Sequence, residues 1–287
     1  MIDSPWPAPA KINLFLHITN RREDGYHELQ TLFQFLDLCD DLWFDIRNDN
    51  KIRRCTEIEG VDEIDDLVIK AANRLREVTG SNLGVDISID KKLPMGGGIG
   101  GGSSDAATTL VALNKLWGLN LPKEDLAKIG LELGADVPFF IHGHTAWAEG
   151  IGEKLQSFSA AESWQEPWYL LVHPDIHIST AKIFSNSQLT RDTTPIRMHT
   201  FIAGDGHNDC ESVVRNSYPE VEKVFDWFGQ ESQARLTGTG ACVFCPYLDE
   251  SAAQETARSL PEHWSGYVIK GLNRSPLLDR LDKEPEG

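Results

Sequence analysis

A run of six glycines within seven residues, at positions 96–102, constrains this chain more than any other feature. It lies in the segment PMGGGIGGGSSDAA at 94–107, after an alternating apolar and polar stretch at 85–90 that predicts a half-buried strand. Apolar residues at helical spacing then predict a helix over about 103–117. Glycines let several backbone N–H groups point into one concavity, and the first turn of a helix favours an anion. The segment therefore predicts a phosphate-binding loop.

Three kinds of phosphate-binding loop compete for this segment. A P-loop requires a lysine followed by Ser or Thr after its last glycine, and the segment has none. The dinucleotide-binding pattern G-x-G-x-x-G can be placed on Gly96, Gly98 and Gly101, but a central parallel strand before it would be continuously apolar. A short glycine-rich turn in which Gly-Ser-Ser opens a helix matches best. A flexible loop without a ligand is the remaining alternative, although ordering so many glycines costs conformational entropy.

The composition argues against polyanionic partners. The 287 residues include 27 Lys and Arg against 44 Asp and Glu, a formal net charge of −17. Such a surface repels nucleic acid, so a phosphate site must rely on backbone N–H groups and a few placed cations. There is no signal-like start or apolar stretch near the roughly 18 residues of a membrane span, and five cysteines indicate reduced thiols. We expect a cytoplasmic protein with small-molecule partners, without nucleic acid or membrane.

The remaining pattern predicts an α+β chain in two parts. Strands with one polar face and clustered helices favour α+β over a doubly wound sheet. Strands are expected at 10–18, 32–38, 42–46, 85–89, 168–173, 241–244 and 267–270, and helices at 67–78, 103–117, 123–133, 209–215, 220–228 and 250–260. A loop-like segment at 156–167 suggests domains 1–160 and 161–287.

Two local patterns place polar side chains at candidate functional positions. In the strand at 10–18, apolar residues at the even positions 12–18 alternate with Lys11, Asn13, Phe15 and His17, so one face is expected in the core. In LGADVPFF, residues 133–140, Asp136 stands two residues before a proline. Its carboxylate is either a helix N-cap or a functional group, and the local sequence favours neither.

Three segments resemble motifs of the galactokinase, homoserine kinase, mevalonate kinase and phosphomevalonate kinase (GHMP) superfamily. They are APAKINLFLHI at 8–18, PMGGGIGGGSSDAA at 94–107 and LTGTGACVF at 236–244, in the order and spacing of that family. The resemblance covers nearly the whole chain. It implies an N-terminal domain like ribosomal protein S5 domain 2, with a left-handed βαβ crossover, and a C-terminal α+β ferredoxin-like domain. The active site would lie in the cleft between them.

Two further segments, RREDGYHELQTLFQFLDLCD at 21–40 and LGADVPFF, narrow the resemblance to one branch of the superfamily. That branch uses ATP to phosphorylate the 2-hydroxyl of a cytidine diphosphate-linked methylerythritol, giving the 2-phosphate and ADP, on the non-mevalonate route to isoprenoid precursors. The resemblance thus implies a small-molecule kinase with ATP and Mg²⁺ as co-substrate, no tightly bound cofactor, and a monomer or weak homodimer.

The resemblance also implies catalytic and nucleotide-binding residues. Asp136 would accept or orient the proton of the attacking hydroxyl, and Lys11 would offset charge near the γ-phosphate. For a strand lysine taken alone, simple exposure is the ordinary interpretation. Contacts to ATP are expected along the glycine-rich loop, at Pro94, Met95, Gly96, Gly97, Gly98, Ile99, Gly100, Gly101, Gly102, Ser103 and Ser104. The two serines, like Asp105, could instead cap the helix, and the Mg²⁺ ligands stay unassigned.

Substrate-binding residues follow from the same resemblance. Asn13 would hydrogen-bond the substrate, Tyr26 and Phe184 would sandwich the cytosine ring, and His27 would hydrogen-bond its polar edge. Taken alone, each aromatic side chain is more often ordinary core. In the LTGTG segment, Gly238 and Gly240 would approach the phosphates or the substrate, with a tight hairpin turn as the alternative.

Rival functions remain open from the sequence. Another kinase of the superfamily, acting on homoserine, mevalonate or a sugar, is disfavoured because those substrates carry no base for Tyr26 and Phe184. A nucleotide-binding regulator that has lost catalysis is disfavoured because both Lys11 and Asp136 are present. A dehydrogenase is disfavoured by the alternating strand before the glycine-rich loop.

Overall fold

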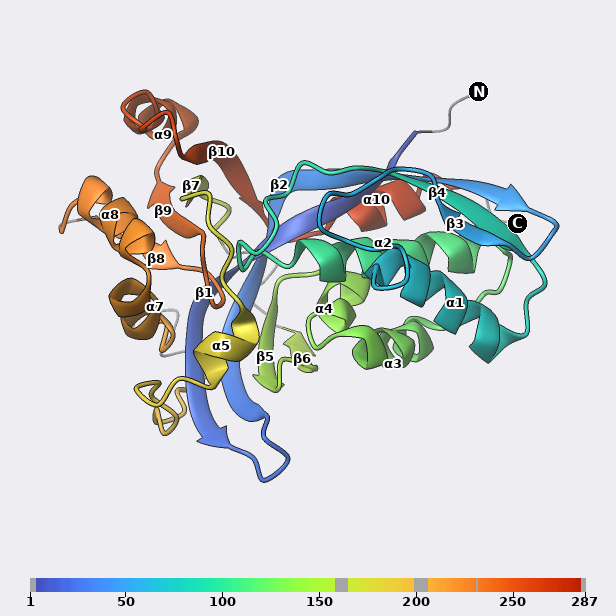
Figure 1. Ribbon diagram of the computed structural model, residues 1–287, viewed down its shortest axis with the longest axis horizontal. Coiled ribbons are helices and arrows are strands. Elements are labelled where there is room, and N and C mark those ends of the chain that lie inside the picture. The colour runs from blue at the N-terminus through green and yellow to red at the C-terminus, as the bar shows by residue number, and fades with distance from the viewer. Residues whose placement is uncertain (1–3, 158–164, 199–205, 231, 285–287) are drawn as a thin grey trace.

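In the part of the chain that the structure describes, ten strands form one hydrogen-bonded sheet that runs through both halves (Figure 1). The computed structural model describes residues 4–157, 165–198, 206–230 and 232–284. The order along the sheet is β3-β4-β2-β10-β7-β9-β8, with β1 and β5 also paired to β2 and β6 paired to β5. The predicted domain boundary, between residues 160 and 161, lies outside the described residues and stays a prediction.

The first half supplies most of the helices that surround the glycine-rich loop. Its elements are β1 (Trp6–Arg21), β2 (His27–Arg47), β3 (Ile52–Arg54), α1 (Leu67–Thr79), β4 (Gly84–Asp90), α2 (Gly101–Leu116), α3 (Lys123–Leu133), α4 (Val137–His142), β5 (Ala146–Gly150) and β6 (Lys154–Ser157). Strands β3 and β4 pair in parallel, and α1 connects them as the helix of a βαβ unit. The helix expected at 123–133 is confirmed with the same bounds.

The second half has shorter elements. They are β7 (Trp168–His173), α5 (Thr180–Phe184), α7 (Glu211–Ser217), α8 (Pro219–Phe228), β8 (Arg235–Leu236), β9 (Val243–Tyr247), α9 (Glu250–Ala257), β10 (Ser265–Leu272) and α10 (Pro276–Leu281). The last helix returns to the first half, where Leu277 joins the core and Leu278 lies against Gly143. None of the helices in the described ranges has the length and apolar composition needed to cross a membrane.

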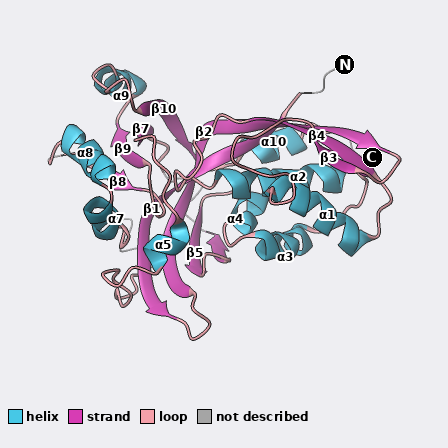
Figure 2. Ribbon diagram, in the orientation of Figure 1, coloured by secondary structure: helices cyan, strands magenta, loops and turns pink. Residues whose placement is uncertain are grey.

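Three hydrophobic clusters hold these layers together. Helices α1–α4 and α10 lie on one side of the first-half strands, around Phe35, Leu110 and Phe139 (Figure 2). Helices α7, α8 and α9 flank the second-half strands. The third cluster, which includes Ile12 and Leu171, joins strands of the two halves. Because this joint is buried, the two halves pack as one body.

The strands expected at 32–38 and 42–46 are one continuous strand, β2, of 21 residues. The residues between the two apolar runs, 39–41, include the aspartates Asp40 and Asp41. Asp40 is nevertheless fully buried, because its carboxylate pairs with Lys91. The same carboxylate accepts hydrogen bonds from the backbone N–H groups of Lys92 (2.6 Å) and Leu93 (2.8 Å). Tertiary partners therefore override the local signal, and they anchor the chain where it enters the glycine-rich loop.

The face of the first strand that was expected in the core is confirmed, because the apolar residues at the even positions 12–18 are buried, but the opposite face is buried as well. Lys11, Asn13 and His17 are all buried, because the second half packs onto a strand that already faces helices. The register of β1 against β2 also shifts between Pro9 and Lys11. Such a shift redirects the side chains that follow it.

We expect Asp40→Ala to lower the free energy of unfolding by about 3 kcal/mol. The change removes one partner of a largely buried ion pair and leaves two backbone N–H groups without their acceptor. Asp41→Ala is the matched control, since Asp41 pairs with Lys92 near the surface and should contribute less than about 1 kcal/mol. Urea unfolding of both variants checks this, and equal losses would contradict the anchoring role of Asp40.

Candidate active site

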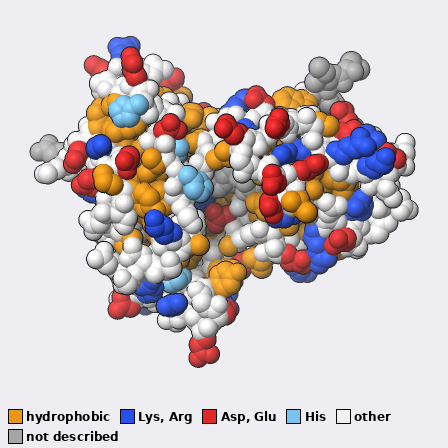
Figure 3. Space-filling view, in the orientation of Figure 1, with side chains coloured by type: hydrophobic (Ala, Val, Ile, Leu, Met, Phe, Trp, Pro, Cys, Tyr) orange, Lys and Arg blue, Asp and Glu red, His pale blue; other side chains and the backbone are white. Residues whose placement is uncertain are grey.

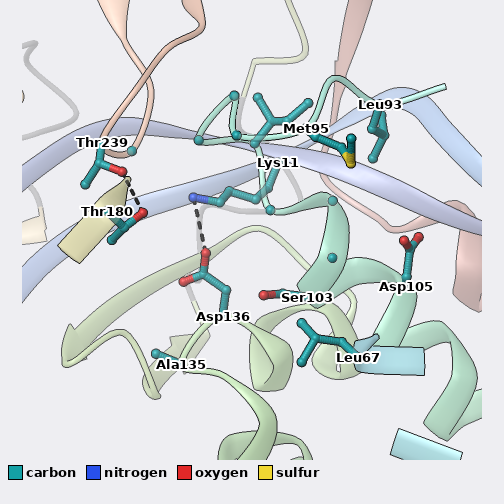
Figure 4. Close-up of a pocket in the computed structure, with 18 of the residues that line it drawn as sticks. Lys11, Leu67, Leu93, Met95, Ser103, Asp105, Ala135, Asp136, Thr180 and Thr239 are labelled. Atoms are coloured by element: carbon teal, nitrogen blue, oxygen red, sulfur yellow. Dashed lines mark hydrogen bonds and ion pairs between the residues drawn. The ribbon is translucent and has the colours of Figure 1, made fainter. Parts of the chain in front are cut away.

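A cavity of about 580 Å³ lies between the two halves, where the surface is notched in Figure 3. Its walls come from β1, the glycine-rich loop, the start of α2, the turn before α4, α5 and the LTGTG segment. In the close-up of Figure 4, Lys11 and Asp136 lie in the middle, with Thr180 and Thr239 on one side and Leu67 on the other. Segments far apart in the sequence therefore line one site.

Left-handed backbone conformations shape the glycine-rich loop. Gly96, Gly98 and Gly100 have φ angles of 69°, 73° and 77°, a region that favours glycine. At Gly98 a Cβ atom would lie only 2.4 Å from the carbonyl oxygen of Thr237. Every predicted contact from Pro94 to Ser103 lines the cavity, so the loop is a continuous wall of it.

Ser104 is the exception among the predicted ATP contacts. Its side chain is fully buried, does not line the cavity and has no hydrogen-bond partner within the described residues. Its backbone N–H donates to the carbonyl of Gly100 (2.8 Å), at the start of α2. The helix begins at Gly101, two residues earlier than expected, and Ser104 lies on its buried face. The structure thus gives the Ser104 hydroxyl no access to a nucleotide in the cavity.

Lys11 and Asp136 form an ion pair in the cavity, with Nζ 3.4 Å from Oδ2 (Figure 4). The Lys11 side chain is 4% exposed and also donates to Oδ1 of Asn13 (2.6 Å). The carboxylate of Asp136 is 30% exposed and makes no capping bond to α4, although the residue stands at its N-cap position. Of the two interpretations of Asp136, the geometry supports the functional group.

Asn13 connects this pair to the LTGTG segment. Its amide donates to Oγ1 of Thr31 (2.9 Å), and its backbone N–H donates to Oγ1 of Thr237 (3.0 Å). The backbone N–H of Lys11 donates to the carbonyl of Ile99 in the glycine-rich loop (3.0 Å). The first strand is therefore hydrogen-bonded to the loop and to LTGTG on either side of the ion pair.

The predicted base-binding residues are only partly brought together. Phe184 lines the cavity, and its ring stacks on that of His27, with centroids 5.0 Å apart and planes 25° apart. His27 is buried and lies outside the cavity lining. Tyr26 is 60% exposed and does not line the cavity either, so the sandwich of Tyr26 and Phe184 is not assembled here. Gly238 lines the cavity and Gly240 does not.

Several residues at the site escaped the sequence analysis. The hydroxyls of Thr180 and Thr239 share a hydrogen bond (2.9 Å) beside the cavity. The amide of Asn208 donates to the carbonyls of Leu236 and Gly238, both at 2.9 Å, and so holds the LTGTG turn. The LTGTG motif contains Thr239 and could have indicated that residue, whereas Thr180 lies outside the motif. Nothing local signals Asn208, because its partners lie about 30 residues further along the chain.

The charges around the cavity are mostly negative. Among the described residues, its lining contains the lysines Lys11 and Lys91 against the aspartates Asp65, Asp66, Asp105 and Asp136. Lys91 is bound to Asp40 and also to Asp105 (2.8 Å), so its charge is already matched. The site cannot attract a nucleotide by a positive field, and backbone N–H groups must contribute much of the phosphate binding.

Asp105 is the most perturbed acid at the site. Burial raises the pKa of its carboxyl to about 7, with the nearby Asp40 carboxylate acting in the same direction and Lys91 opposing both. One oxygen of Asp105, Oδ1, is buried without a hydrogen-bond partner among the described residues. Burial of a carboxylate without full pairing is costly, and the proton compensates for it.

Comparison with known proteins places this architecture. Residues 66–144 match the model of the GHMP kinases N terminal domain, and residues 197–266 match that of the GHMP kinases C terminal domain. A 4-diphosphocytidyl-2-C-methyl-D-erythritol kinase of Shewanella baltica (strain OS223) is 50% identical over 281 residues, covering 98% of each chain. One of the same name from Halorhodospira halophila (strain DSM 244 / SL1) is 52% identical over 274 residues, covering 96% of this chain and 95% of that one.

Solved structures agree with these relatives. The crystal structure of 4-(cytidine 5'-diphospho)-2C-methyl-D-erythritol kinase superimposes with a TM-score of 0.77 at 28% identity, covering 92% of this chain and 98% of that chain. A crystal structure of mevalonate kinase has a TM-score of 0.71 at 14% identity over 95% of this chain, which shows a shared fold.

A glycine-rich loop at a helix start, facing a lysine–carboxylate pair across one cleft, defines a small-molecule kinase that uses ATP. The chain belongs to the GHMP kinase family. The expected family and its two-part α+β fold are thereby confirmed.

We expect Gly98→Ala to destabilise the fold by at least about 1–3 kcal/mol. The residue has a positive φ, and an added Cβ would meet the carbonyl oxygens of Thr237 and Gly240 at 2.4 and 2.9 Å. Gly102→Ala is the control, because Gly102 lies inside α2 and an added Cβ would meet only Leu67, at 3.5 Å. This variant should be as stable as the unmodified chain, or more stable by up to about 1 kcal/mol. Denaturant unfolding compares the two, and a Gly98 variant as stable as the Gly102 variant would refute the close packing.

We expect Asp105→Asn to change how stability depends on pH. The pKa of Asp105 is about 7 when folded against an ordinary value of 3.8, so the folded chain binds the extra proton between these values. Stability from this group therefore falls as pH rises from about 4 to above 7. Without nucleotide or divalent ions, Tm of the unmodified chain should drop relative to that of the variant by about 2 °C or more between pH 5 and pH 8. Parallel Tm curves would contradict the raised pKa.

Proposed function

We propose that the protein transfers the γ-phosphoryl group of ATP to the 2-hydroxyl of 4-diphosphocytidyl-2-C-methyl-D-erythritol, giving the 2-phosphate and ADP. The observation that carries this proposal is the Lys11–Asp136 pair between the glycine-rich loop and the side of the cavity lined by Phe184. Relatives at 50% and 52% identity over nearly the whole chain, with that substrate in their names, support the choice of acceptor.

The nucleotide would occupy the side of the cavity nearest α1. That side has apolar side chains suited to the face of an adenine ring, contributed by Ile58, Val61, Leu67, Leu93 and Met95. From there, phosphates could follow the glycine-rich loop to the first turn of α2, where N–H groups and the helix dipole favour anions. The γ-phosphate would then lie near Lys11, whose backbone is bonded to the loop at Ile99.

The chemistry follows from the ion pair. A substrate hydroxyl beside Asp136 would donate its hydrogen bond to the carboxylate, which orients the oxygen and accepts its proton during attack on the γ-phosphorus. Lys11 is buried against Asn13 and Asp136, so its ammonium is held in place without reorganisation. It would stabilise the negative charge that spreads over the transferred group.

Mg²⁺ is expected with ATP, and the residues present fit it. The cavity lining has more carboxylates than cations, and Oδ1 of Asp105 is buried without a partner among the described residues. Carboxylate and hydroxyl oxygens are donors that Mg²⁺ accepts, usually one or two of them beside phosphates and water. Asp105 and Ser103 would hold the ion, which would neutralise phosphate charge. The described residues contain no cluster of three or more His, Cys, Asp or Glu side chains that could hold a metal ion.

The acceptor would occupy the side of the cavity formed by α5 and LTGTG. Leu16, Leu29 and Phe184 offer an apolar wall there, and Thr180, Gly238 and Thr239 offer polar groups. For the cytosine to be sandwiched, Tyr26 would have to move from its exposed position toward Phe184.

The net charge of −17 supports small-molecule partners rather than nucleic acid, and we propose that the enzyme acts in the cytoplasm.

The test is ADP formation from ATP and Mg²⁺ with diphosphocytidyl-methylerythritol, mevalonate, homoserine and galactose as separate acceptors. We expect turnover with the cytidine compound only, and a fall in kcat of about 10²–10⁴-fold in Asp136→Asn because the carboxylate is lost. Lys11→Met should lower kcat by about 10²–10³-fold. Turnover with another acceptor would replace the substrate proposed here, and no turnover with any of the four would favour a regulatory nucleotide-binding protein.

A further inference from the structure

A chain of buried hydrogen bonds leads from the Lys11–Asp136 ion pair into the first two strands. The ammonium of Lys11 donates to Oδ1 of Asn13 (2.6 Å). The amide nitrogen of Asn13 donates to the hydroxyl of Thr31 (2.9 Å), and that hydroxyl donates to the backbone carbonyl of Phe15 (2.5 Å). Lys11 and Asn13 are each 3% exposed and Thr31 is 0% exposed, so bulk water does not compete for these bonds.

The two ends of this chain fix the direction of every bond in it. An ammonium has hydrogens to donate and no lone pair with which to accept, so Lys11 requires an amide oxygen opposite it. A backbone carbonyl only accepts, so the hydroxyl hydrogen of Thr31 points to Phe15 and its oxygen accepts from Asn13. The amide of Asn13 therefore has one orientation that satisfies both neighbours, with Oδ1 toward Lys11 and Nδ2 toward Thr31.

Irregular pairing between the first two strands brings Thr31 to this position. Asn13 is opposite Phe33, and Thr31, two residues from Phe33, is on the same face of the sheet. Beyond Asn13 the register shifts, so that Thr31 is opposite Leu16. At this shift the Thr31 hydroxyl binds the backbone carbonyl of Phe15, which anchors the side chain on the main chain of β1. Lysine has a long flexible stem, so the amide between them is positioned from the Thr31 side.

The orientation of the amide matters because of what else surrounds the ammonium. Nζ of Lys11 is 3.4 Å from Oδ2 of Asp136 and 5.0 Å from the ring centroid of Phe33. If the amide of Asn13 were turned over, its NH₂ group would face the ammonium, and two donors cannot satisfy one another. Lys11 would then leave Asn13 and with it the position beside Asp136.

We propose that Thr31 is a positioning residue for phosphoryl transfer, which fixes the amide of Asn13 and through it the ammonium of Lys11. The proposal rests on the function proposed above, in which Lys11 stabilises charge on the transferred group. Thr31 belongs to the cavity lining, yet it is fully buried and its hydroxyl hydrogen is bound to Phe15, so it acts through Asn13. A cation held in place needs no reorganisation during the reaction, so loss of Thr31 is expected in kcat more than in KM.

The first test observes the ammonium without any substrate. Protein labelled with ¹⁵N-lysine is examined by NMR, and the Lys11 ammonium signal is assigned by its loss in Lys11→Met. In the unmodified chain we expect slow hydrogen exchange of this ammonium, because it is buried and hydrogen-bonded. Thr31→Val should speed the exchange, whereas Thr31→Ser keeps the hydroxyl and should keep the exchange slow. Equal exchange in the Thr31→Val and unmodified chains overturns the proposal.

The second test measures steady-state kinetics with ATP, Mg²⁺ and the cytidine compound. Thr31→Val keeps the shape of the side chain without its hydroxyl. We expect its kcat to fall roughly 10- to 100-fold with little change in either KM, as for one buried hydrogen bond lost from the transition state. Thr31→Ser should retain the kcat of the unmodified enzyme. If the valine variant does not fold, Thr31→Ala provides the same comparison, and an unchanged kcat in the variant that folds contradicts the positioning role.

A double variant tests whether Thr31 acts through Asn13. Asn13→Ala removes the amide, so the addition of Thr31→Val should lower kcat no further. If the two losses multiply instead, Thr31 acts by another route and the proposal is wrong.

Thr145→Val is the matched control. Thr145 is also buried, and its hydroxyl is hydrogen-bonded to the carbonyl of Leu272 and to Oδ1 of Asn273, outside the cavity lining. This variant should lower Tm without changing kcat or the exchange of the Lys11 ammonium. A Thr31→Val variant that likewise loses only Tm has a purely structural defect, which refutes the proposal. If the unmodified enzyme turns over none of the four acceptors, the proposed function fails, and the NMR result still decides whether Thr31 fixes Lys11.

Discussion

The structure depends on a glycine-rich loop that is hydrogen-bonded on several sides at once. The carbonyls of Gly96 and Gly97 accept from the backbone N–H groups of Ala241 (3.1 Å) and Cys242 (3.0 Å) in the second half. On the other side, Ile99 accepts from Lys11 in the first strand. In all three bonds the loop contributes a backbone carbonyl as the acceptor. The loop and the start of α2 line the cavity, and N–H groups at such a helix start favour anions.

The register shift in β1 places the ion pair of Lys11 and Asp136. Before the shift, Trp6 and Ala8 pack with the helices of the first half, and after it Ile12 and Leu14 pack toward the second half. Lys11 therefore comes to the side of the strand on which α4 begins, and meets Asp136 there. A regular strand would have directed the lysine away from the carboxylate, since alternate residues point to opposite faces.

The acidic character of the chain explains how its cations are used. Lys11 and Lys91 are both bound to carboxylates, and the extra anchoring by Asp40 holds the strand that leads into the loop. A nucleotide brings further negative charge to a site that is already negative, so the binding of its phosphates depends on oriented N–H groups.

The sequence by itself determined the loop, the strand–helix framework around it and the residue types of the site. Some features are local properties of the sequence and could be predicted without a structure. They are the run of glycines, the apolar alternation and the bounds of the helix at 123–133. The sequence wrongly predicted two strands where β2 is continuous, because the burial of Asp40 depends on Lys91, some 50 residues away in the sequence. Only the tertiary structure decided that Asp136 faces Lys11 instead of capping α4, that Ser104 is buried, that Tyr26 lies apart from Phe184, and that Asn13 is hydrogen-bonded to Thr31. These outcomes depend on packing between distant segments, which no local pattern encodes.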